Sequence, residues 1–175
     1  MSDLNADQLT APPALPLQMN LQYTKDLSFE VPSGAEIFAT LRSNPSISVQ
    51  IDVQVNRLQQ EQNVFEVTLA IKAEAAEPPA TEGGASGRTV FIVELAYAAV
   101  VTLGTNAPEQ MVEPILLVEV PRLIFPYARN IISEVTRDGG FPPVVLQPID
   151  FVALWQAKRA QATPSAANAP VAGNA

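Results

Sequence analysis

The 175-residue sequence contains no cysteine and no histidine. Without cysteine the chain can form neither disulfides nor thiolate metal sites, and without histidine it lacks the commonest general base and metal ligand. Lys and Arg number 10 against 18 Asp and Glu, which gives a net charge of −8. This balance argues against a nucleic-acid binder, because such a protein needs a basic face. Any charged partner of the chain is expected to be basic.

Long apolar segments are also missing. No apolar run reaches the roughly 18 residues of a membrane-spanning helix, and the N-terminal residues lack the basic start and apolar stretch of a signal peptide. We therefore predict a cytoplasmic protein without direct membrane insertion. The length suits one domain over residues 18–160. A proline-containing tail over 1–17 is expected to be disordered, and an alanine-rich tail over 161–175 to be flexible.

Alternation of apolar and polar residues predicts four strands, each with one buried face. They cover residues 21–31, 47–56, 65–74 and 91–103. In the first, the side chains expected in the core are Leu21, Tyr23, Leu27, Phe29 and Val31, and Lys25 alone interrupts them. The second and third strands are separated by the short polar break at 59–63 and are expected to form a hairpin. The fourth is apolar on both faces, which favours subunit contact and predicts a tetramer.

Helical periodicity follows the strands. The residues expected on one apolar helix face are Leu123, Ile124, Tyr127, Ile131, Ile132 and Val135. This helix should begin or kink near Pro126 and end at 138–140. Pro114 predicts a short or kinked helix over 108–120, and Asp150 is a suitable N-cap for a helix from Phe151 to about Arg159. The expected fold is α+β in two layers, a four-stranded antiparallel sheet with helices packed on one face.

No motif typical of an enzyme active site is present. A serine nucleophile would need a base other than histidine, and the sequence has no G-x-S-x-G element. Two carboxylate pairs, Glu74 with Glu77 and Glu109 with Glu113, could offer oxygen ligands to a divalent ion. Solvated charge on a loop and on a helix face is the favoured interpretation of both pairs. The sequence therefore predicts a protein that is not an enzyme and that binds no metal and no cofactor.

Two long and unusual strings stand at the ends of this patterned region. They are YTKDLSFEVP at Tyr23–Pro32 and LIFPYARNIISEVTRDGGFPPVVLQPIDFVALW at Leu123–Trp155. Both closely resemble SecB, the protein-export chaperone family, and with the strands between them the resemblance covers about residues 21–155. The resemblance implies a SecB-like sheet with helices on one face and a homotetramer built as a dimer of dimers. The enlarged loop at 77–88 and Pro114 depart from the family pattern.

The same resemblance implies a cytoplasmic holdase that binds unfolded preproteins and passes them to the SecA translocation motor. The family's SecA-binding residues match four positions here, Asp26, Glu30, Ile92 and Glu94. The alternation pattern agrees, because all four lie opposite the side chains expected in the core. In SecB-like proteins the partner is the zinc-bearing C-terminal tail of SecA, so the zinc belongs to the partner.

A holdase needs exposed apolar surface that accepts many sequences. The candidates for this substrate groove are Met111, Ile115, Leu116 and Leu117, with Tyr97, Val49 and Ile51 as its floor. Core packing explains the last three at least as well. Two other functions also remain open. One is a dedicated SecB-like chaperone of a toxin–antitoxin pair, and the other is a thioesterase of the hot-dog type, which also wraps a sheet over a helix.

Overall fold

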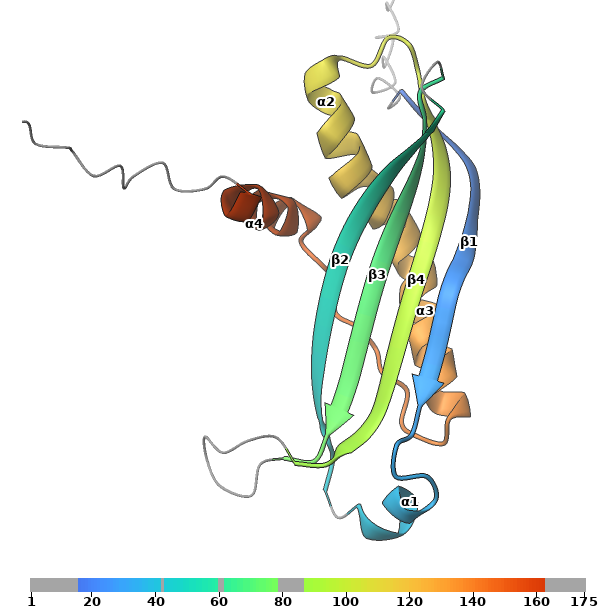
Figure 1. The fold of residues 1–175 in the computed structure, drawn as a ribbon, viewed down its shortest axis with the longest axis vertical. Coiled ribbons are helices and arrows are strands. Elements are labelled where there is room, and N and C mark those ends of the chain that lie inside the picture. The colour runs from blue at the N-terminus through green and yellow to red at the C-terminus, as the bar shows by residue number, and fades with distance from the viewer. Residues whose placement is uncertain (1–15, 42, 60–61, 79–86, 163–175) are drawn as a thin grey trace, which may run out of the picture.

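The computed structural model describes residues 16–41, 43–59, 62–78 and 87–162 (Figure 1). Nearly all of the expected tails over 1–17 and 161–175, and most of the enlarged loop at 77–88, lie outside these ranges. The elements in chain order are β1 Leu17–Glu30, α1 Glu36–Thr40, β2 Ser46–Gln59, β3 Val64–Ala76, β4 Thr89–Leu103, α2 Glu109–Pro114, the π-helical η1 Ile115–Glu119, α3 Val120–Asp138 and α4 Phe151–Ala162.

The four strands form one antiparallel sheet in the order β1-β4-β3-β2. The expected hairpin of β2 and β3 is confirmed, and β1 pairs with β4 from the other side. The long helix α3 lies against one face of the sheet, and no other element among the described residues covers the opposite face (Figure 1). The predicted two-layer α+β fold is therefore confirmed. We call the two sides of the sheet the helix face and the open face.

The core lies between the helix face and α3. Alternate residues of the two central strands are almost fully buried there, among them Val67, Leu69, Ile71, Phe91, Val93 and Leu95. They pack in one cluster with Ile124, Ala128 and Ile132 of α3. Each fully buried large apolar side chain contributes roughly 1.5–3 kcal/mol before conformational entropy is subtracted.

The alternation of β1 is interrupted by two bulges. The register against β4 shifts between Met19 and Leu21 and again between Thr24 and Asp26. Each shift moves the following side chains to the other face of the sheet. Leu21 and Tyr23 therefore pair with open-face residues of β4 and Leu21 is 51% exposed. The prediction that both residues belong to the core is wrong, and β1 also begins four residues earlier than predicted, at Leu17.

The helical segment after β4 is continuous but irregular. Pro114 ends α2 and is followed at once by the π-helical turn η1, as expected where a proline cannot donate to the carbonyl four residues before it. The predicted interruption at Pro114 is thus confirmed. The long helix α3 begins at Val120, not near Pro126, with Pro121 in its first turn and Pro126 inside it.

The predicted apolar stripe of α3 is only partly buried. Ile124 and Ile132 face the core, whereas Leu123 and Tyr127 are 48% and 51% exposed. The buried stripe instead advances through Ala128 and Thr136 at four-residue steps. Leu123 and Tyr127 were wrongly predicted as core residues. Both leave apolar surface exposed on α3, although the Tyr127 ring stacks on that of Tyr97 at a centroid distance of 6.3 Å.

The end of α3 is set by close packing. The helix stops at Asp138, as predicted, and a Cβ added to Gly139 would lie 2.2 Å from the ring of Phe29. The chain then crosses back without regular structure to Asp150, and Thr136 Oγ1 accepts a hydrogen bond from Val144 N–H at 3.0 Å on the way. The Asp150 carboxylate accepts hydrogen bonds from the first backbone N–H groups of α4, which confirms the predicted N-cap.

Candidate functional site

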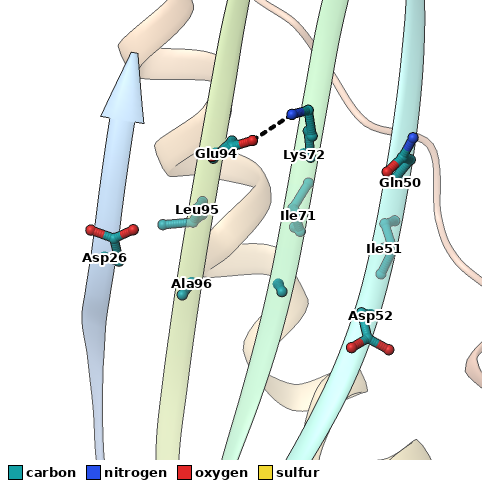
Figure 2. Close-up of a pocket in the computed structure, with 10 residues that line it drawn as sticks. Asp26, Gln50, Ile51, Asp52, Ile71, Lys72, Glu94, Leu95 and Ala96 are labelled. Carbon is teal, nitrogen blue, oxygen red and sulfur yellow. Dashed lines mark hydrogen bonds and ion pairs between the residues drawn. The ribbon is translucent and has the colours of Figure 1, made fainter.

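Successive rows of side chains cross the open face. One row runs over all four strands through Asp26, Ala96, Ala70 and Asp52. The two alanines leave a shallow hollow of about 410 Å³, and the carboxylates stand at its two edges (Figure 2). Three strand spacings of about 4.8 Å place the β1 and β2 positions roughly 14 Å apart. The hollow is thus an apolar floor between negative rims.

The next two rows hold the other predicted SecA-binding residues. Glu94 lies between Ser28 and Lys72, and Ile92 lies between Glu30 and Glu74. The structure therefore brings Asp26, Glu30, Ile92 and Glu94 together on the open face, in three adjacent rows. Lys72 Nζ lies 2.6 Å from Glu94 Oε1, and both side chains remain exposed (Figure 2). The hydrogen bond from Lys72 to the Glu94 carboxylate raises the pKa of Lys72.

Asp52 links the hollow to the last helix. Lys158 of α4 reaches over the edge strand β2 and donates to the Asp52 carboxylate and, at 2.9 Å, to the backbone carbonyl of Val53. Partial burial raises the pKa of Asp52, but the hydrogen bonds from Lys158 and Gln54 outweigh it and hold that pKa below its ordinary value. Asp52 is therefore an ionised rim of the hollow that is already engaged within the chain.

A cluster around the Glu66 carboxylate on the open face was not predicted from the sequence. The bulges of β1 direct Tyr23 and Lys25 to Glu66 on β3, and Lys25 Nζ lies 2.6 Å from Glu66 Oε2. Glu66 is only 8% exposed. The hydrogen bonds from Lys25 and then Tyr23 hold its pKa below the usual range. The one available signal was Lys25, a cation interrupting an otherwise apolar alternation.

Glu66→Gln is expected to lower the free energy of unfolding at pH 7 by about 1–2 kcal/mol. Hydrogen bonds to a charged group contribute about 1.5–3 kcal/mol, and this range is reduced because Lys25 is about half exposed. Since the pKa of Glu66 is lowered on folding, the stabilisation is present above 4.5, its ordinary pKa, and is lost as the pH falls below it. Urea unfolding measures the change. The matched control is Glu94→Gln, whose pair is exposed, and equal losses in both variants would contradict the prediction.

Two apolar grooves lie on the helix side of the molecule. The first, the β2 groove, has about 460 Å³ and is bounded by Ile47, Val49 and Ile51 of β2 and by the crossing segment 143–149. The second, the α2 groove, has about 570 Å³ and lies between the end of the sheet and α2. Its apolar lining is Val55, Phe65, Leu103, Val112, Leu116 and Leu117. Both grooves leave aliphatic side chains accessible at the edge of the sheet.

The predicted groove residues fall in different places. Leu116 and Leu117 line the α2 groove, and Val49 and Ile51 line the β2 groove. Met111 is exposed on α2 outside both linings, and the structure does not bring it to either groove.

Two further candidates, Ile115 and Tyr97, are buried in the core, so they offer no open surface. Ile47 and Val145, which line the β2 groove, were missed. The first continues the strand alternation, and the second lies in an apolar crossing bounded by prolines, so both signals were present in the sequence.

Comparison with known proteins gives consistent results. The family described as "Preprotein translocase subunit SecB" matches residues 10–162. Protein-export protein SecB 1 of Gluconobacter oxydans (strain 621H) is 76% identical over 155 residues, 89% of each chain. Protein-export protein SecB of Gluconacetobacter diazotrophicus is 78% identical over 153 residues, 87% of this chain and 89% of its own.

A solved structure resembles the fold at 12% identity with a TM-score of 0.59, covering 77% of this chain and 91% of the other. It is the SecB-like chaperone of Mycobacterium tuberculosis in complex with a ChAD peptide from the HigA1 antitoxin. Within the described ranges no helix is long and apolar enough to cross a membrane. The family match and the close relatives also set aside the thioesterase alternative, since SecB proteins are chaperones and not enzymes: the chain belongs to the SecB family of protein-export chaperones.

Proposed function

We propose that this chain is an ATP-independent holdase, which binds unfolded precursor proteins in the cytoplasm and delivers them to the SecA motor. The observation that supports this most is the difference in surface chemistry between the two sides of the sheet. The helix side carries two apolar grooves of about 460 and 570 Å³, whereas the open face carries the carboxylates around the alanine-floored hollow. One molecule can thus hold a client on one side and meet a basic partner on the other.

The grooves suit clients of many sequences. Their linings are mainly aliphatic, and such surfaces accept different apolar side chains without demanding specific hydrogen bonds. Val49 of β2 and Val145 of the crossing segment both line the β2 groove. We therefore assign client binding to the β2 and α2 grooves, with Leu116, Leu117, Val49 and Ile51 retained from the sequence prediction.

The open face suits the SecA tail. Asp26 and Glu30 stand on the edge strand β1, and Glu94 and Ile92 stand beside them on β4. Acidic groups around an apolar floor complement a basic segment with an apolar contact of its own. These four residues are the docking set that we propose for SecA.

A homotetramer is part of the proposal. Leu123 and Tyr127 are about half exposed on α3, and Leu21 is exposed on the edge strand β1. Apolar side chains gathered at an edge and on a helix surface favour burial against other copies of the chain. Light scattering of the purified protein measures the assembly directly.

A dedicated role in a toxin–antitoxin system is the other candidate. The Mycobacterium tuberculosis chaperone was solved with an antitoxin peptide, but at 12% identity the likeness concerns the fold alone. The relatives at 76% and 78% identity are protein-export SecB proteins. General export is therefore the function that we favour.

The holdase function predicts a simple result. Added to a chemically unfolded model protein on dilution into buffer without ATP, the chain should suppress aggregation in proportion to its concentration. Turbidity measures the effect, and an inert acidic protein at equal mass is the control. If aggregation proceeds as fast as in the control, or if suppression requires nucleotide, the proposed function is wrong.

A further inference from the structure

The proposed docking set contains one carboxylate that is already engaged. Lys72 Nζ lies 2.6 Å from Glu94 Oε1, on neighbouring strands of the same row. Glu30 and Glu74 add further attraction to the Lys72 ammonium. Asp26 and Glu30, by contrast, take part in no side-chain hydrogen bond or salt bridge within the part of the chain that the structure describes. The three carboxylates are therefore not equivalent toward a basic partner.

The position and exposure of this pair indicate that Lys72 competes with a partner's cation for Glu94 and contributes little to the stability of the fold. Both side chains are close to half exposed, at 41% for Lys72 and 49% for Glu94. Such exposed pairs stabilise a fold little and open readily to water. Lys72 also lines the alanine-floored hollow next to Glu94 (Figure 2), which offers the displaced side chain room. A basic group that approaches Glu94 must therefore displace the Lys72 ammonium before it can pair.

We infer that Lys72 is a built-in counter-ion that gates the acidic docking face, so that a cationic partner binds through Glu94 only by displacing it. This inference rests on the proposed SecA-docking function and adds its regulation. Lys72 weakens the binding of weakly basic segments, because the attraction that they gain at Asp26 and Glu30 is too small to offset the loss of the Lys72–Glu94 pair. It thus favours a partner with several cations arranged across the three rows. Lys72 is a positioning residue here, because it acts through Glu94.

The test removes the competing charge and measures binding of the zinc-loaded C-terminal peptide of SecA by calorimetric titration. Lys72→Gln should bind the peptide roughly 1.5- to fivefold more tightly than wild type at low salt, the range expected from loss of one exposed ion pair. The gain should shrink at high salt because exposed charges are screened. Lys72→Arg keeps the pair and should bind like wild type. In a Glu94→Gln background the gain from Lys72→Gln should disappear, since the competed carboxylate is gone.

The matched control is Lys25→Gln. Lys25 lies on the same open face, forms a pair of the same 2.6 Å length, and its removal changes net charge equally, but its carboxylate is Glu66, outside the docking set. An equal gain from Lys25→Gln would mean that overall charge is responsible and would overturn the gate. So would unchanged or weaker binding by Lys72→Gln while wild type binds. If wild type itself fails to bind the peptide, the proposed SecA-docking function is wrong, and the proposed role of Lys72 is wrong as well.

Discussion

Asp26→Lys combined with Glu30→Lys is expected to weaken binding of the SecA tail by more than tenfold while leaving the fold intact. Each exposed ion pair contributes only about 0.2–1 kcal/mol, but reversal replaces attraction with repulsion at both positions. The summed change is on the order of 2–3 kcal/mol. Neither side chain takes part in a hydrogen bond or salt bridge in the described ranges, so the folded chain loses only the weak attraction of Glu30 to Lys72.

Calorimetric titration of the SecA C-terminal peptide at two salt concentrations measures this effect. Glu134→Lys with Asp138→Lys is the matched control, because it changes the net charge equally on exposed positions of α3, away from the open face. The control should bind the peptide as wild type does. Binding that is insensitive to salt, or a double reversal that binds like wild type, would reject the site. Loss of the tetramer in the double reversal would instead show that the open face is a structural contact.

Most of the fold could be predicted because its signals are local. The four strands alternate with period two, and the β2–β3 hairpin follows from a short polar break. Helix α2 ends at Pro114 and helix α3 ends before Gly139, as the backbone chemistry of proline and glycine predicts. Strict alternation failed only in β1, where bulges depend on pairing with β4 and cannot be read from one strand.

The open-face residues were predicted from the sequence more accurately than the Glu66 cluster and the exposed residues of α3. The open-face residues Asp26 and Glu94 follow from parity, because polar side chains opposite a core position must face outward. The Glu66 cluster was not predictable, since it joins residues 43 and 41 positions apart across a bulged strand. On α3 the helical period admits several apolar stripes. Which of them is buried depends on the crossing angle over the sheet, so the exposure of Leu123 and Tyr127 was not predicted.

The groove residues could likewise be predicted only in part from the sequence. Aliphatic composition identifies residues that prefer to leave water, but it does not distinguish a core position from an accessible one. Ile115 in η1 and Tyr97 on the helix face of β4 became core residues, while Ile47 and Val145 stay accessible. That distinction arises from the path of the crossing segment 143–149, which bounds the β2 groove without closing it.

Val49→Asp combined with Val145→Asp is expected to abolish client holding at concentrations where wild type is saturated. Both side chains line the β2 groove and are 41% and 53% exposed, so the change costs the folded chain little. A client side chain that covers a valine gains roughly 1.5–3 kcal/mol from full burial. Replacing two valines with charges removes that gain and adds the cost of dehydrating two carboxylates. Affinity for an unfolded client should fall at least a hundredfold.

Fluorescence anisotropy of a labelled, permanently unfolded polypeptide measures this affinity. The matched control is Ser48→Asp with Asn56→Asp, which adds the same charge to exposed open-face positions of the same strand. That control should hold the client as wild type does. The valine variant should bind the SecA peptide unchanged, because the β2 groove opens on the opposite side of the sheet from the docking set. Full client binding by the valine variant would remove the β2 groove from the function. Equal weakening in the control would trace the effect to net charge, since the two variants share only that change.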